Sequence, residues 1–313
     1  MVHRHFLDLA DFSAETLRAL LDAAHARKAA RAGLPTAMPD ADRPLDGHML
    51  GMVFDKPSTR TRLSFDLAMR QLGGQTMLLN QADTQLGRGE TIEDTARVMA
   101  RFCDISMLRT GLHDNLLAYA EASDVPVING LTAAGHPCQI LADLMTLEEH
   151  KGALEGRRIA WFGDGNNVAH SLMLCGALLG VNIRIGCPPG FEPLNGVLEQ
   201  SRALAQAGAT IDITNSPCEA VKDAQAIYTD VWASMGQEQE QTQRIEAFAD
   251  FHVDEKLLGR AASDAIVMHC LPAHRGEEIS AEVMEGAQSR IFDQAENRLH
   301  VQQALLAAVM GGL

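Results

Sequence analysis

The segment Asp55–Phe65 reads DKPSTRTRLSF and places hydroxyl and guanidinium groups within a few consecutive residues. An apolar run, Met49–Phe54, precedes it and predicts a buried strand. A helical pattern follows it and stops at Gly73-Gly74. The predicted inner face of this helix consists of Leu63, Leu67, Ala68 and Leu72. The chain therefore turns from a strand into a helix at Ser58–Thr61.

This turn has the chemistry of an anion-binding site. Free backbone N–H groups and the positive end of the helix dipole converge at a helix N-terminus. Such a position suits an anion, and phosphate above all. Arg60 adds a planar fork that binds phosphate through two hydrogen bonds. The alternative is an ordinary helix start capped by Ser58 or Thr59, but Arg60 and Arg62 on either side of Thr61 favour the anion.

The charge of the chain narrows the kind of ligand. The 313 residues include 41 acidic and 26 basic ones, for a formal net charge of −15. A chain this acidic binds nucleic acid poorly and is repelled by anionic membrane surfaces. Arginines clustered in an acidic protein therefore indicate a small anionic ligand.

The six cysteines are scattered and form no CxxC pair, which disfavours a disulfide framework and a zinc knuckle and suits a reducing cytoplasm. The first residues, MVHRHFLDLADF, carry charges inside any apolar core and do not resemble a signal peptide. No run of about 18 apolar residues predicts a membrane span. We expect a cytoplasmic protein.

Apolar strand patterns alternate with helical patterns along the whole chain, which predicts an α/β fold with parallel, doubly wound sheets. A boundary near Lys151–Arg157 separates two such series. We expect two domains, residues 1–150 and 151–296, each with a central parallel sheet flanked by helices. The last helix, predicted at Leu299–Val309, is expected to complete the first domain over about residues 297–313.

Ligands of such sheets bind beyond the carboxyl ends of the strands. Arg109 directly follows the predicted strand Ile105–Leu108, and His136 lies where GHPCQ opens a helix. Ser58 lies at a third strand end. These residues are therefore expected to share one site.

In the second half, Arg158–Ala169 reads RIAWFGDGNNVA and at first resembles a dinucleotide fingerprint. Val168 occupies the third small position, and the next strand ends at Gly186-Cys187 without the acidic residue that binds a ribose. Both departures weaken the reading as a nicotinamide oxidoreductase. What remains is a helix N-terminus at which Asn167 can meet a carboxylate.

Two further strand ends carry polar groups. Asp230, in TDVWASMG, can pair with an ammonium group, although an isolated turn aspartate is often merely solvated. His269 and Cys270, in MHCLPAH, suggest a metal site. Neighbours on an extended strand point to opposite faces, so these two cannot easily bind one ion. No metal is expected.

Five segments together resemble the aspartate/ornithine carbamoyltransferase family, in its order and over nearly the whole chain: STRT at 58–61, HPCQ at 136–139, DGNN at 164–167, DVWASMG at 230–236 and HCLP at 269–272. The HCLP and SMG elements resemble the branch that uses ornithine rather than the one that uses aspartate. The resemblance implies that the first domain binds carbamoyl phosphate and the second binds ornithine.

The resemblance also implies roles for individual residues. Contacts to carbamoyl phosphate are implied for Ser58, Thr59, Arg60, Thr61, Gln85, Arg109, His136, Gln139, Cys270, Leu271 and Arg298. Contacts to ornithine are implied for Asn167, Asp230, Ser234 and Met235. The catalytic residues would be Arg109, His136, Asp230 and Cys270. The family pattern further implies a homotrimer in which Gln85 reaches a neighbouring subunit.

The reaction implied is transfer of the carbamoyl group to the δ-amine of ornithine, giving citrulline and phosphate in arginine biosynthesis. Arginine breakdown, the reverse direction, would use the same site. No cofactor is expected, because the guanidiniums supply the positive charge. Three alternatives stay open: another amine acceptor such as N-acetylornithine or putrescine, a nicotinamide oxidoreductase, and a binding protein without activity.

Overall fold

A computed structural model describes residues 5–80, 89–233 and 240–311 of the chain. The chain divides into two compact units. Unit 1 comprises Met1–Ala142 and Glu296–Leu313, and unit 2 comprises Asp143–Ala295. The chain passes from one unit to the other within two helices, α5 (Pro137–Lys151) and α12 (Ile291–Val309).

Unit 1 contains a four-stranded parallel sheet in the order β2-β1-β3-β4. Its strands are β1 (Met49–Phe54), β2 (Gln75–Asn80), β3 (Ile105–Arg109) and β4 (Val127–Leu131). The chain proceeds from β1 to β2 on one side and then adds β3 and β4 on the other side. The strand order therefore reverses between β1 and β3, and the ends of these two strands mark the place where such sheets bind ligands.

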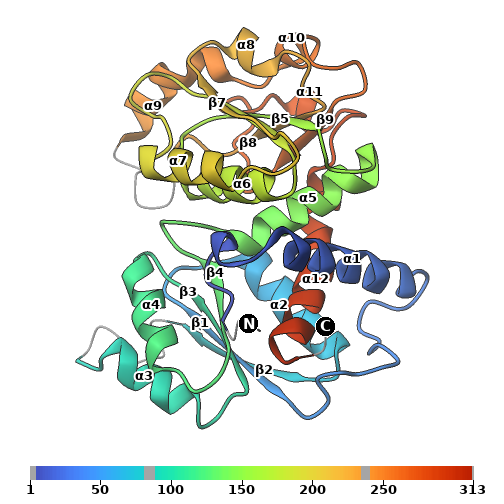
Figure 1. Cartoon of the computed structure of the whole chain (residues 1–313), viewed down its shortest axis with the longest axis vertical. Helices are drawn as coiled ribbons and strands as arrows, with labels where there is room; N and C mark the ends of the chain where they lie inside the picture. Colours follow the sequence, from blue (N-terminus) through green and yellow to red (C-terminus); the bar gives the residue numbers. More distant parts are fainter. Residues whose placement is uncertain (1–4, 81–88, 234–239, 312–313) are drawn as a thin grey trace. The chain divides into compact units, whose positions relative to one another are not determined.

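Helices cover both faces of this sheet (Figure 1). Besides α12, they are α1 (Ala14–Ala30), α2 (Thr59–Gln71), α3 (Ile92–Met99) and α4 (His113–Ala122). The inner face of α1 buries Leu17, Leu20, Leu21 and Ala24, and Ser13 caps the helix by accepting from the Thr16 N–H. Helix α4 was not predicted. It packs with α3 on one face of the sheet, where Val53, Met99, Leu108 and Tyr119 share a core.

The predicted inner face of α2 is wrong at Leu63, whose residue surface is 65% exposed. The buried stripe includes Thr61, Phe65, Ala68 and Leu72. These positions repeat every three to four residues, whereas Leu63 lies about 200° around the helix from Thr61. The apolar pattern was misleading because Thr61, a polar residue, points inward.

Unit 2 contains a five-stranded parallel sheet in the order β7-β6-β5-β8-β9. Its strands are β5 (Arg158–Phe162), β6 (Asn182–Gly186), β7 (Ile211–Thr214), β8 (Ala226–Thr229) and β9 (Ile266–His269). The order reverses between β5 and β8, so the segments after these two strands lie at a second ligand-binding position.

Helices also cover both faces of the second sheet. They are α6 (Asn167–Leu178), α7 (Asn195–Leu204), α8 (Pro217–Val221), α9 (Gln241–Phe248), α10 (Glu255–Leu258) and α11 (Ala281–Met284). An added Cβ on Gly176 of α6 would meet Ile183, and one on Gly186 would meet Ala220 of α8. Positions 183 and 186 of β6 face opposite sides, so α6 and α8 cover opposite faces. The predicted class, α/β with two parallel sheets flanked by helices, is confirmed.

One prediction about the helices needs correction: α12 begins at Ile291 rather than at Leu299. Its first turns are rich in polar residues and read as a loop, yet Gln294 and Asn297 are fully buried. No helix among the described residues combines the length and apolarity that crossing a bilayer requires.

A buried charge network holds the segment after α1 in unit 1. Asp40 accepts from Arg27 Nη1 at 2.9 Å, from Arg31 Nη1, and from Gln303 Nε2 at 3.4 Å. The side chains of Arg31 and Asp40 are only 7% and 10% exposed. Asp42 also accepts from Arg27, but its side chain is 57% exposed.

Replacing Asp40 is expected to destabilise unit 1 far more than replacing Asp42. Asp40→Ala leaves the buried Arg31 without its carboxylate, and breaking a buried ion pair costs about 3–5 kcal/mol. Asp42→Ala should cost less than about 1 kcal/mol, because its pair is solvated. Urea unfolding followed by circular dichroism measures both. Equal losses for the two variants would show that the Asp40 network does not hold unit 1 together.

Candidate functional site

Unit 1 gathers predicted site residues around the fully buried hydroxyl of Thr61. Thr61 Oγ1 accepts hydrogen bonds from Arg109 Nη1 at 3.2 Å and from Arg298 Nη2 at 2.9 Å. Arg298 also donates through Nη1 to Gln139 Oε1 at 3.2 Å. We call Arg60, Arg109 and Arg298, with Thr61 and His136, the guanidinium cluster. Sequence positions that are far apart thus meet at one place in unit 1.

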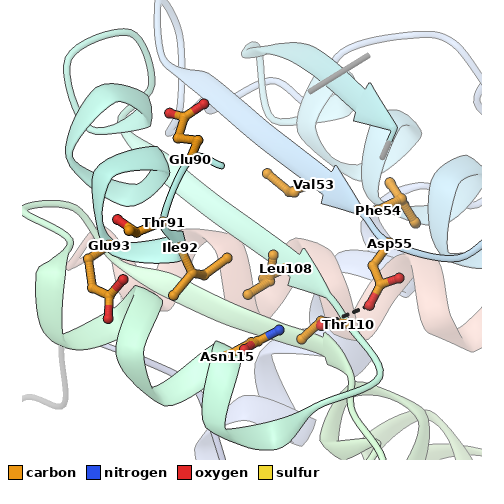
Figure 2. A pocket seen from close by; sticks show the side chains of 10 residues that line it. All are labelled: Val53, Phe54, Asp55, Glu90, Thr91, Ile92, Glu93, Leu108, Thr110 and Asn115. Atoms are coloured by element: carbon orange, nitrogen blue, oxygen red, sulfur yellow. Dashed lines mark hydrogen bonds between the residues drawn. The ribbon is translucent and has the colours of Figure 1, made fainter. Parts of the chain in front are cut away.

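The strand order explains why Arg109 and Thr61 meet. Arg109 is the last residue of β3, and the segment that leads into α2 leaves β1, the neighbouring strand. Asp55 connects the segment after β1 to the segment after β3. Its Oδ2 accepts from Thr110 Oγ1 at 3.0 Å and from the Gly111 N–H at 2.9 Å. Figure 2 shows the first of these bonds.

Ser58 occupies the N-cap position of α2 but makes no capping hydrogen bond through its side chain. Ser13 and Thr91, by contrast, cap α1 and α3 with their hydroxyls. The ordinary-cap interpretation therefore does not describe Ser58. Thr59 follows as the exposed first residue of α2. The first turn of this 13-residue helix retains the polarity that attracts anions.

The electrostatics of the cluster keep His136 neutral. Burial lowers the pKa of His136 well below its usual value, and Arg298, Arg109 and Arg60 lower this pKa further. The imidazole is therefore uncharged at neutral pH and protonates only in acid. It can donate a hydrogen bond without adding charge, while three guanidiniums supply a positive field. This combination suits a ligand with a phosphate group and a polar carbonyl.

A cavity of about 460 Å³ opens beside the ends of β1 and β3 (Figure 2). Asp55, Glu90 and Glu93 line it together with apolar residues such as Val53 and Leu108. None of the predicted ligand contacts that the structure describes lines this cavity, and its carboxylates oppose a phosphate. The guanidinium cluster therefore suits an anion better than this cavity does.

Unit 2 has its own polar cluster at the point where its strand order reverses. Asp230 follows β8, and its Oδ2 accepts from Asn166 Nδ2 at 2.9 Å. Its Oδ1 accepts from the Cys270 thiol at 3.0 Å and from the Val231 N–H at 2.9 Å. Cys270 follows β9 and is half-buried. A carboxylate and a thiol thus adjoin one another, and this chemistry suits an amine or ammonium group.

The residue that bonds to Asp230 is Asn166, which the sequence analysis did not select. Asn166 is the N-cap of α6, where its Oδ1 accepts from the N–H groups of Val168 and Ala169. Asn167 is the first residue of the helix and is half-buried. The preference of N-caps for Asn directly before an apolar helical run was the signal that could have identified Asn166.

Arg244 was also missed. Its Nη1 donates to Asp164 Oδ2 at 2.8 Å and to the Trp232 carbonyl at 2.9 Å. It thereby joins the segment after β5 to the segment after β8. Burial raises the pKa of Asp164, and the Arg244 guanidinium opposes that rise. Arg244 lies in a polar helix that gives no sequence signal of burial.

His269 stabilises the turn that contains Cys270. Its Nδ1 accepts from the Leu271 N–H at 2.8 Å, so the ring proton is on Nε2, which donates to Glu278 Oε1 at 3.0 Å. His269 and Glu278 are both fully buried. Leu271 has a left-handed backbone with φ of 61°, and this conformation needs such support.

The strand argument against a metal at His269 and Cys270 does not hold. Ligand atoms of Asp230, His269 and Cys270 all lie within 4.8 Å of one another. Cys270 lies beyond the end of β9, where alternation between the faces of a strand no longer applies. Both ring nitrogens of His269 already have protein partners.

The glycine of the DGNN segment, Gly165, is needed for packing within unit 2. A Cβ on Gly165 would lie 2.1 Å from the Pro193 nitrogen and 2.5 Å from the Glu192 carbonyl carbon. In dinucleotide folds this glycine lets the pyrophosphate approach. Here the chain's own backbone fills that position, which further weakens the nicotinamide alternative.

Three predicted site residues, Gln85, Ser234 and Met235, lie outside the described residues.

The chain matches two family models that together span most of its length. Residues 4–149 match "Aspartate/ornithine carbamoyltransferase, carbamoyl-P binding domain", and residues 155–309 match "Aspartate/ornithine carbamoyltransferase, Asp/Orn binding domain". The ornithine carbamoyltransferase of Parasynechococcus marenigrum (strain WH8102) is 60% identical over 312 residues, which cover 99% of this chain and 95% of that protein.

Solved structures agree with this match. The ornithine carbamoyltransferase of Pyrococcus furiosus superposes with a TM-score of 0.93 at 47% identity, covering 99% of this chain and 97% of that one. The anabolic ornithine carbamoyltransferase of Campylobacter jejuni gives a TM-score of 0.91 at 39% identity, covering 99% of each chain. The chain belongs to the aspartate/ornithine carbamoyltransferase family.

Proposed function

We propose that the protein transfers the carbamoyl group of carbamoyl phosphate to the δ-amine of L-ornithine, giving L-citrulline and phosphate. The observation that carries the proposal is the guanidinium cluster, in which Arg109 and Arg298 share the Thr61 hydroxyl beside a neutral histidine. The full-length similarity to ornithine carbamoyltransferases supports the same reaction.

Carbamoyl phosphate binds at unit 1 in this proposal. The first turn of α2, with Ser58, Thr59, Arg60 and Thr61, holds the phosphate through backbone N–H groups, hydroxyls and a guanidinium. Arg109 and His136 donate to the carbonyl oxygen. The remaining contacts to this substrate are assigned, following the family pattern, to Gln85, Gln139, Cys270, Leu271 and Arg298.

Ornithine binds at unit 2, with contacts assigned to Asn167, Asp230, Ser234 and Met235. The hydrogen bond between the Cys270 thiol and Asp230 supports a role for both in placing the amine that reacts. An ornithine amine is largely protonated at neutral pH, and only its neutral form has the electron pair to attack. The site must therefore favour that form at the reacting position.

In the reaction, the amine nitrogen forms a bond to the carbamoyl carbon and the bond from that carbon to the phosphate oxygen breaks. One amine proton passes to the departing phosphate. Negative charge grows on the carbonyl oxygen and then on the phosphate. Fixed donors aimed at these oxygens lower the barrier, and each such donor typically contributes about 10²–10³ in rate. Because His136 is neutral, it donates without repelling the nearby guanidiniums.

Three further properties are part of the proposal. The direction is biosynthetic, supported by the similarity to the anabolic Campylobacter enzyme. The location is the cytoplasm, where six cysteines without disulfides are chemically stable. The assembly is a homotrimer in which Gln85 completes a neighbouring site. An active monomer in sedimentation would contradict that assembly.

The reaction is tested by incubating the protein with carbamoyl phosphate and one of four amines: ornithine, N-acetylornithine, putrescine or aspartate. We expect a carbamoylated product with ornithine only, because the relatives of this chain are ornithine carbamoyltransferases. Product with a different amine would retain the role of the guanidinium cluster and overturn the assignment of unit 2. A folded protein without any product would indicate a binding protein.

Cys270→Ser and Asp230→Asn test the placement of the amine. Each change alters one side of the hydrogen bond between thiol and carboxylate, so we expect lower kcat with ornithine and a shifted pH–rate profile. Steady-state rates across pH measure both effects. An unchanged rate and pH profile in both variants would rule out this role. Cys218→Ser, at an exposed cysteine, is the matched control and should change neither quantity.

A further inference from the structure

A buried network in unit 2 ends at the strand that delivers Cys270. The side chains of Asp143 and Gln294, from α5 and α12, are fully buried. Gln294 Nε2 donates to Asp143 Oδ1 at 2.7 Å, and Tyr228 donates its hydroxyl to Asp143 Oδ2 at 2.8 Å. Gln294 Oε1 accepts from the His269 backbone N–H at 2.8 Å. No family motif of the sequence analysis includes Asp143, Tyr228 or Gln294.

Gln294 accepts a hydrogen bond from a backbone N–H group, that of His269, which does not pair with a neighbouring strand. Strand β9 is at the edge of its sheet, so its outer N–H and C=O groups have no neighbouring strand. The segment before α12 replaces that strand: Val267 N–H donates to the Gln288 carbonyl, and Arg290 N–H donates to the Val267 carbonyl. At His269, the last residue of β9, the Gln294 side chain accepts from the backbone N–H in place of a neighbouring backbone carbonyl. The position of the strand end therefore depends on Gln294.

Asp143 fixes which way the Gln294 amide points. A carboxylate accepts hydrogen bonds, so it attracts the NH₂ end of the amide and leaves the oxygen for the His269 N–H. The opposite orientation would place the NH₂ group against another donor and an oxygen against a carboxylate. Tyr228 remains a donor, because burial first and then Asp143 raise the pKa of its hydroxyl well above the usual value.

We propose that Gln294, oriented by Asp143, is a positioning residue that fixes the end of β9 and hence the place where the Cys270 thiol meets Asp230. Two hydrogen bonds connect Gln294 to this turn. Gln294 Oε1 accepts from the His269 N–H, and His269 Nδ1 accepts from the Leu271 N–H. Cys270 lies between His269 and Leu271 in the chain. The inference rests on the proposed carbamoyl transfer, because the amine is placed by Cys270 and Asp230 in that reaction.

The test compares Gln294→Met with Gln303→Met. Both glutamines are fully buried residues of α12, and Gln303 donates to Gln71 Oε1 at 2.8 Å without touching either cluster. Each substitution removes a buried amide of similar volume. For Gln294→Met we expect kcat with ornithine to fall by about 10- to 100-fold, the scale of a 1 Å misplacement. For Gln303→Met we expect a lower unfolding temperature and an unchanged kcat.

Gln294→Glu tests whether a carboxyl group can restore activity when it is protonated. A merely structural role of Gln294 would not make the activity of this variant depend on pH. A protonated carboxyl donates to Asp143 and accepts from the His269 N–H, as the amide does. Once both carboxyls ionise they repel, so activity relative to wild type should be retained at about pH 6 and lost towards about pH 9, the range to which burial raises a carboxyl pKa. The titratable groups near the pair are Tyr228 on β8, His269 and Cys270 at β9, Asp230 and Glu278. If Gln294→Met fails to fold, the pH profile of Gln294→Glu alone tests the positioning role of Gln294.

The outcomes separate the two claims. A wild-type protein that makes no citrulline contradicts the proposed function itself. An active wild type with Gln294→Met at full kcat, or with Gln294→Glu in constant ratio to wild type across pH, overturns the role of Gln294. Equal loss of kcat in Gln294→Met and Gln303→Met also overturns it, because that result reflects general damage to α12.

Discussion

The buried contact between the Thr61 hydroxyl and the guanidiniums of Arg109 and Arg298 is the interaction that unites the polar residues of unit 1. Burying Arg109 and Arg298 near Arg60 is costly unless polar groups and an anion compensate the charge. Thr61 and Gln139 provide part of the compensation through their oxygens. A fully buried histidine at the same place is kept neutral and adds no further charge. In the proposed function, the phosphate of the substrate compensates the remaining positive field.

The order of the strands explains where the polar residues gather. In each sheet the order reverses once among the described strands, between β1 and β3 in unit 1 and between β5 and β8 in unit 2. The predicted residues Arg109 and Asp230 lie at these reversals, directly at or after a strand end. Apolar strands supply a rigid base, and the short segments beyond them supply the chemistry. The two reversals therefore account for two polar clusters in one chain.

Much of this could be predicted from the sequence because apolar runs and motifs carry local signals. The alternation of parallel strands and helices, and the turn from β1 into α2, were predicted in this way. Burial of polar residues was not visible, since it depends on partners far along the chain. The burial of Thr61 was therefore not predicted, Asn166 was not selected, and the polar start of α12 was not assigned to the helix. Arg244, Asp143 and Gln294 were missed for the same reason.

The decisive experiment on the guanidinium cluster is calorimetric titration of carbamoyl phosphate into the protein without ornithine. We expect saturable binding of one ligand per chain, and much weaker binding in Thr61→Val, which removes the hydroxyl shared by Arg109 and Arg298. Thr95→Val, at a buried threonine of α3 outside the cluster, should bind as wild type does. An absence of binding to the wild type, or equal affinity in Thr61→Val, would contradict binding of carbamoyl phosphate at the guanidinium cluster.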